Sequence, residues 1–106
     1  MTILSIDIGG SKIKAALLDS AGTPVSARER VETPRPAPPD AVLPLIGQLA
    51  AKLPGYDRVS VGFPGALRDG IVRTAPNLGT PPWAGFDLAG ALRERLGKPA
   101  RLSCEN

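Results

Sequence analysis

The spacing of hydrophobic and polar positions predicts three strands in the first third of the chain. An apolar run at residues 3–8 is followed closely by a second at 13–18, with two glycines between them, which is typical of a β-hairpin. Turn-forming residues fill 19–24. Residues 25–31 alternate weakly and include three charged side chains, so we expect a third, more exposed antiparallel strand there.

A first helix is predicted between two proline-containing boundaries. It opens at Pro39-Asp40 and ends at Pro54-Gly55. Its apolar face consists of four residues at helical spacing, Val42, Leu45, Ile46 and Leu49. Pro44 lies within the first turns, so the helix either starts there or is kinked. The connector before it, residues 33–39, holds four prolines and is expected to be extended.

Strands and a second helix alternate in the rest of the chain. We predict a buried strand at residues 58–63, a small hairpin at 68–72 and an irregular segment at 74–85. A second helix at 86–96 and a last strand at 100–104 follow. The resulting order, βββαβαβ, predicts an α/β fold. Three antiparallel strands followed by alternating αβ units give a mixed five-stranded sheet with helices packed on it.

Composition narrows the possible classes of protein. With 106 residues, 42% hydrophobic and 22% charged, the chain is expected to form one domain. The net charge of +3 is spread without a basic stripe, so we expect no nucleic-acid partner. One cysteine and no histidine leave no basis for a disulfide framework or a zinc site. No run of about 18 apolar residues predicts a membrane span, and the N-terminus lacks a basic signal-peptide region. We therefore expect a cytoplasmic protein.

The turn between the first two predicted strands has the chemistry of a phosphate-binding site. Gly9 and Gly10 allow the backbone to approach an anion closely, and successive N–H groups in such a turn can form an anion-binding nest. Ser11 adds a hydroxyl and Lys14 a positive charge, while Asp7 is placed to hold a hydrated Mg²⁺. The same residues also fit an ordinary hairpin turn with a strand-end carboxylate.

Five segments in register resemble the ROK family of bacterial sugar kinases, repressors and related proteins. They are residues 7–14, Gly62-Phe63-Pro64-Gly65, Thr74-Ala75-Pro76-Asn77-Leu78, Trp83 with Phe86-Asp87-Leu88, and Glu105-Asn106. Within the family, the amino-acid sequence around residues 62–77 is similar to that of polyphosphate glucokinases. The resemblance covers nearly the whole chain and implies a ribonuclease H-like domain of the actin and hexokinase superfamily.

The resemblance implies a carbohydrate kinase that transfers a phosphoryl group from ATP or polyphosphate to a hexose, with glucose 6-phosphate as the expected product. The implied phosphate-binding residues are Gly9, Gly10, Ser11 and Lys14, and the implied Mg²⁺ ligand is Asp7. The implied substrate-binding residues are Pro64, Gly65, Asn77, Glu105 and Asn106, with Glu105 supporting the loop. Asn77 also fits a plain turn residue after Pro76. Zinc is not expected, because the family's zinc-binding segment would lie beyond Asn106.

The family's catalytic base would be an Asp directly after Asn106, so no catalytic residue is expected within the chain. We expect residues 1–106 to be the N-terminal domain of a larger kinase, inactive when isolated. The full-length protein is expected to be a homodimer, and the isolated half to self-associate. Two alternatives are a non-catalytic sugar-binding remnant and a sugar-sensing ROK regulator. The regulators carry a helix-turn-helix segment before the phosphate strand, which favours the kinase.

Overall fold

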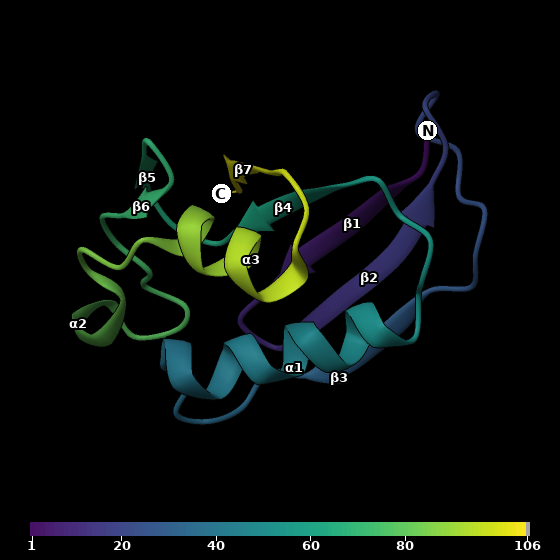
Figure 1. Cartoon of the computed structure of the whole chain (residues 1–106). Helices are drawn as coiled ribbons and strands as arrows, with labels where there is room; N and C mark the ends of the chain where they lie inside the picture. The colour runs from purple at the N-terminus through teal and green to yellow at the C-terminus, as the bar shows by residue number, and fades with distance from the viewer. Residues whose placement is uncertain (106) are drawn as a thin grey trace.

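A mixed five-stranded sheet forms the centre of the computed structural model, which describes residues 1–105. Its strands are β1 (Ile3–Ile8), β2 (Lys12–Leu18), β3 (Glu29–Glu32), β4 (Arg58–Phe63) and β7 (Ala100–Cys104). They lie in the order β3-β2-β1-β4-β7 (Figure 1). Strands β1, β4 and β7 run parallel, and β2 is antiparallel to both β1 and β3. The predicted mixed sheet is confirmed.

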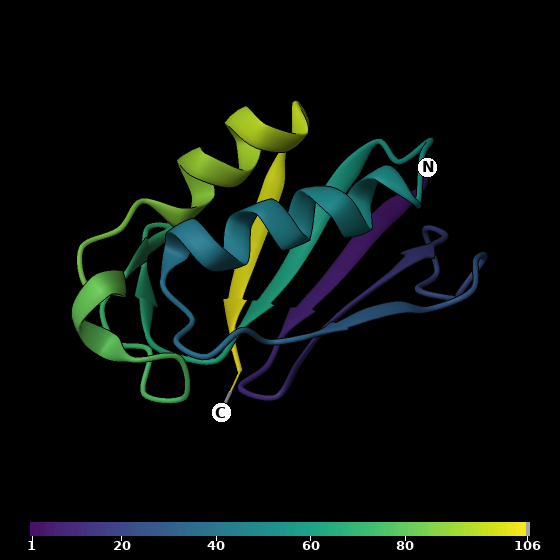
Figure 2. The same cartoon turned by 90° about the horizontal axis from the view of Figure 1, so that it is seen from below.

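The two longer helices, α1 (Pro39–Ala51) and α3 (Leu88–Leu96), cover the same face of the sheet (Figure 2). A short hairpin, β5 (Leu67–Arg68) and β6 (Ile71–Val72), forms a separate two-stranded sheet after β4. A one-turn helix, α2 (Thr80–Trp83), follows that hairpin. Within residues 1–105 no helix is long and apolar enough to cross a membrane.

The alternation of side chains in β1 decides which face of the sheet the helices cover. Leu4, Ile6 and Ile8 are at most 2% exposed and lie in the core, whereas Ser5 and Asp7 point to the opposite side. Each fully buried aliphatic side chain of this size stabilises the fold by about 1.5–3 kcal/mol. We call the opposite side the open face, because no helix within residues 1–105 packs on it (Figure 2).

The helix boundaries follow the predicted signals closely. Helix α1 begins at Pro39 and continues through Pro44, which removes one intrahelical hydrogen bond but does not delay the start. In α3, the Asp87 carboxylate accepts a hydrogen bond of 3.0 Å from the Gly90 N–H. Gly97 ends the helix at a left-handed φ of 67°. The predicted end of this helix at residue 96 is confirmed.

Two predicted segments differ from the structure. Strand β3 spans four residues rather than 25–31, because Ser26 accepts the Leu17 N–H with its hydroxyl and takes the place of a strand partner. The segment expected to be irregular, 74–85, contains α2. Pro81 and Pro82 occupy the first turn of this helix, where the missing N–H groups would have no intrahelical partner.

Candidate functional site

The turn that joins β1 to β2 is closed by backbone and side-chain hydrogen bonds. The Gly9 N–H donates to the Lys12 carbonyl at 2.9 Å, which leaves Gly10 and Ser11 at the tip. Thr33 donates its hydroxyl to the Gly9 carbonyl at 2.7 Å and its N–H to the Ser11 carbonyl at 2.9 Å. A Cβ at position 9 would lie 2.8 Å from the Lys12 carbonyl oxygen, so this turn requires glycine there. Sequence reasoning missed Thr33.

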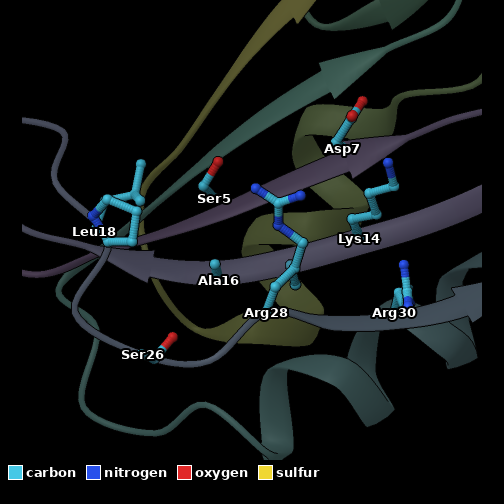
Figure 3. A pocket seen from close by; sticks show the side chains of 10 residues that line it. Ser5, Asp7, Lys14, Ala16, Leu18, Ser26, Arg28 and Arg30 are labelled. Atoms are coloured by element: carbon cyan, nitrogen blue, oxygen red, sulfur yellow. The ribbon is translucent and has the colours of Figure 1, made fainter.

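Asp7 and Lys14 lie beside each other on the open face, next to this turn. They are directly paired across β1 and β2, and Arg30 of β3 is paired with Lys14 (Figure 3). These side chains line a cavity of about 710 Å³ that extends along β2 toward Arg28 and Ser26 (Figure 3). Two of the predicted phosphate- and metal-site residues therefore share one surface with two further arginines.

A second carboxyl group meets Asp7 from the other side of β1. The Glu105 side chain crosses over Gly62 of β4, where an added Cβ would overlap the Glu105 carboxylate. A hydrogen bond with Asp7, partial burial and the charge of Asp7 all raise the pKa of Glu105 above its usual 4.5. Two adjacent carboxyl groups are the oxygen ligands that Mg²⁺ prefers, so this pair fits a hard divalent cation.

The glycine-proline turn after β4 brings the predicted sugar-binding segments together. Pro64 and Gly65 are buried, and a Cβ at Gly65 would overlap the Thr74 carbonyl oxygen. The Ala66 N–H donates to that same carbonyl at 3.1 Å. Asn77, three residues after Thr74, is exposed. The close packing at Gly65 therefore fixes where the segment containing Asn77 begins.

Asn77 also contacts the turn between β1 and β2, at Gly10. Its Cβ lies 3.1 Å from the position that a Cβ would take on Gly10. Together with Arg35 and Pro36, these two residues line a small cavity of about 220 Å³. The predicted phosphate-binding and sugar-binding segments are thus neighbours in space, although they are more than sixty residues apart in the chain.

Trp83 packs in the core beneath the site and anchors the connector before α1 through a hydrogen bond. It is fully buried, and its indole N–H donates to the Ala37 carbonyl at 2.7 Å. Its ring centroid lies 5.2 Å from that of Phe63 and 5.8 Å from that of Phe86. Trp83 is therefore a packing residue of the core.

The predicted site residues gather where parallel strands end. Asp7 lies near the end of β1, Pro64 follows β4, and Glu105 follows β7. The Glu105 N–H donates to the Phe63 carbonyl at 2.7 Å, which holds the segment after β7 beside the turn after β4. Ligands of α/β proteins bind at this edge of a parallel sheet. Asn106, also predicted to bind sugar, lies outside the described residues.

Comparison with known proteins gives a consistent result. The ROK family profile matches residues 3–105. The polyphosphate glucokinase of Mycobacterium tuberculosis is 33% identical over 93 residues, which cover 87% of this chain. The inorganic polyphosphate/ATP-glucomannokinase of Arthrobacter sp. superposes with a TM-score of 0.85 at 33% identity over 95% of this chain. A ROK family glucokinase of Streptomyces griseus, solved with glucose and AMPPNP, superposes over 98% of this chain with a TM-score of 0.84 at 25% identity.

These matches confirm the expected actin- and hexokinase-like α/β fold. The chain spans about a third of the length of the curated relatives it matches, 35% for the M. tuberculosis enzyme. It covers 43% of the Arthrobacter protein and 33% of the S. griseus protein.

Proposed function

Because the chain belongs to the ROK family of proteins, we propose that it forms the phosphate- and sugar-binding half of a hexose kinase. The reaction is transfer of a phosphoryl group from polyphosphate or ATP to glucose, giving glucose 6-phosphate. The observation that supports this best is the contact between Gly10 and Asn77, which brings a donor-rich turn against an exposed amide. The names of the M. tuberculosis and Arthrobacter relatives favour polyphosphate and glucose as substrates.

The turn between β1 and β2 would hold the terminal phosphates of the donor. Gly10 and Ser11 lie at its tip, so their N–H groups and the Ser11 hydroxyl can donate to phosphate oxygens. Lys14, half-buried on the adjacent strand, adds a fixed positive charge. Phosphoryl transfer depends mainly on such positioning and on stabilising negative charge that spreads over the transferred group.

Asp7 would hold Mg²⁺ through water, with the Glu105 carboxyl beside it. When bound, the ion would neutralise charge on the donor phosphates. The hydrogen bond between Glu105 and Asp7 requires a proton in the absence of a cation. A divalent cation would replace that proton, so we expect donor binding with Mg²⁺ to release protons in the pH range where Glu105 is protonated.

The sugar would lie against Pro64, Gly65 and Asn77. The side-chain amide of Asn77 can both donate to and accept from sugar hydroxyls, while the buried turn at 64–65 provides a rigid wall. Asn106 would add a second amide. The general base would come from an Asp in the segment that follows Asn106 in the parent protein, so residues 1–106 alone should bind ligands without turnover.

We expect the parent enzyme to be cytoplasmic, since its phosphoryl donors are cytoplasmic metabolites. We also expect it to be a homodimer, as the family resemblance implies. The part that residues 1–105 can play is tested by ¹⁵N–¹H NMR on the labelled chain. Tripolyphosphate with Mg²⁺ should shift the amides of Gly10, Ser11 and Lys14, and glucose should shift Asn77. Shifts confined to residues away from these two segments would refute the proposal. Asp7→Asn should weaken the effect of Mg²⁺ without changing the response to glucose.

A further inference from the structure

Thr33 is a buried polar residue that lies outside the predicted phosphate- and sugar-binding segments. It is 6% exposed and is the one buried polar side chain found within residues 1–105. It directly follows β3, at the start of the proline-rich connector that leads to α1. A buried hydroxyl is costly unless it is hydrogen-bonded. Its partner, the Gly9 carbonyl, lies 24 residues earlier, in the turn between β1 and β2.

Thr33 and the turn itself together satisfy three carbonyl groups of the turn, those of Gly9, Ser11 and Lys12. The Thr33 hydroxyl donates to Gly9 at 2.7 Å, its N–H donates to Ser11 at 2.9 Å, and the Gly9 N–H donates to Lys12 at 2.9 Å. A two-residue hairpin commonly uses the Lys12 N–H to satisfy the Gly9 carbonyl. Here the Thr33 hydroxyl does so instead.

The N–H donors at the tip of the turn, unlike its carbonyl acceptors, have no hydrogen-bond partner among the described residues. Within the part of the chain that the structure describes, the N–H groups of Gly10 and Ser11 donate to no protein acceptor. The tip of the turn therefore presents two N–H donors, while the carbonyl oxygens of Gly9, Ser11 and Lys12 already accept hydrogen bonds. An anion at the tip would meet these successive N–H groups, which are the donors of an anion-binding nest.

We propose that Thr33 is a positioning residue for the phosphate-binding turn. It binds the Gly9 and Ser11 carbonyls and so holds the Gly10 and Ser11 N–H groups toward the terminal phosphate of the phosphoryl donor. This inference rests on the proposed function, since it concerns the donor site of the same kinase. Thr33 does not touch the donor, and it acts through the turn.

The connector that contains Thr33 is itself held at its other end. The Ala37 carbonyl accepts the indole N–H of Trp83 at 2.7 Å, and Trp83 is fully buried. Thr33 is therefore attached to the core through a segment of four residues. A residue held in this way can fix the turn because its own position is determined by packing.

The test is a titration of the ¹⁵N-labelled chain with tripolyphosphate in the presence of Mg²⁺, followed at the Gly10 and Ser11 amides. Thr33→Val removes the hydroxyl and keeps the shape, and Thr33→Ser keeps the hydroxyl. We expect the Kd to rise about tenfold or more in T33V, about 1.4 kcal/mol, and to stay within about twofold in T33S. If T33V does not fold, T33A is measured by the same criteria.

Asp57→Ala is the control, because it removes a side chain that accepts the Thr2 N–H at 2.8 Å just before β1, at the opposite end of that strand from the turn. It should lower stability and leave the Kd unchanged. A folded T33V chain with wild-type affinity would overturn the role of Thr33 while leaving the donor site intact. A wild-type chain without shifts at Gly10 and Ser11 would overturn both the inference and the proposed donor site.

Discussion

Replacing Trp83 by Phe tests whether the loops around the site are held by one buried hydrogen bond. The substitution keeps an aromatic ring but removes the N–H that reaches the Ala37 carbonyl at 2.7 Å. Ala37 is 5% exposed, so water cannot easily take the place of the lost donor. A buried carbonyl left without a partner costs about 1–3 kcal/mol. The smaller ring adds a cavity term, so we expect a total loss of about 2–4 kcal/mol.

Chemical denaturation followed by far-ultraviolet circular dichroism measures this loss, because Trp83 is the only tryptophan and the tryptophan fluorescence signal is lost in the variant. A loss of this size lowers the Tm of a chain of about 100 residues by about 10–20 °C. Phe86→Leu is the control, since the Phe86 ring packs against the same indole without a side-chain hydrogen bond and the substitution should cost about 1 kcal/mol. W83F with stability within about 0.5 kcal/mol of wild type would refute the anchoring role of Trp83.

Three further predictions concern the carboxyl pair and the open face. The raised pKa of Glu105 means that the folded chain binds its proton more tightly than the unfolded chain, so stability should fall as pH rises from 4.5 through the folded value. Glu105→Gln should remove that slope in urea titrations between pH 4 and 8, and an unchanged slope would contradict the pairing with Asp7. Gly62→Ala should displace the Glu105 carboxylate and return its pKa toward 4.5 by carboxyl ¹³C NMR, whereas the control Gly47→Ala, whose new Cβ would meet Arg95 at 3.6 Å, should leave it raised. The open face, uncovered by helices in residues 1–105, should make the isolated chain self-associate (Figure 2), and a single monomeric species across micromolar concentrations in sedimentation velocity would contradict this.

Local patterns were sufficient to predict most of the fold. The glycine pair at 9–10 and the apolar runs around it predicted the β1–β2 hairpin, and the pattern at 86–96 predicted α3 with its observed end at Leu96. The start of β3 was predicted wrongly because a side chain, Ser26, satisfies the β2 backbone where a strand was expected. A side chain that replaces a strand partner in this way depends on tertiary position and leaves no periodic signal in the sequence.

The site was predictable only as separate segments. The chemistry of Asp7 and of the glycine turn could be inferred from residue types, but the approach of Glu105 over Gly62 depends on the register of three parallel strands. Thr33 was missed because a threonine before a proline is ordinary in a connector. Its contact with Gly9 joins residues 24 positions apart, and a glycine-rich turn alone does not indicate such a partner.

The most direct test of the account is phosphoryl transfer by a chimera. Residues 3–105 would replace the matching segment of the M. tuberculosis polyphosphate glucokinase, to which this chain is 33% identical. We expect the chimera to phosphorylate glucose with polyphosphate or ATP, and Asp7→Asn to lower kcat by about 100-fold while glucose binding is kept. A chimera that folds and binds glucose but transfers no phosphoryl group would contradict the proposal that this chain is half of a hexose kinase.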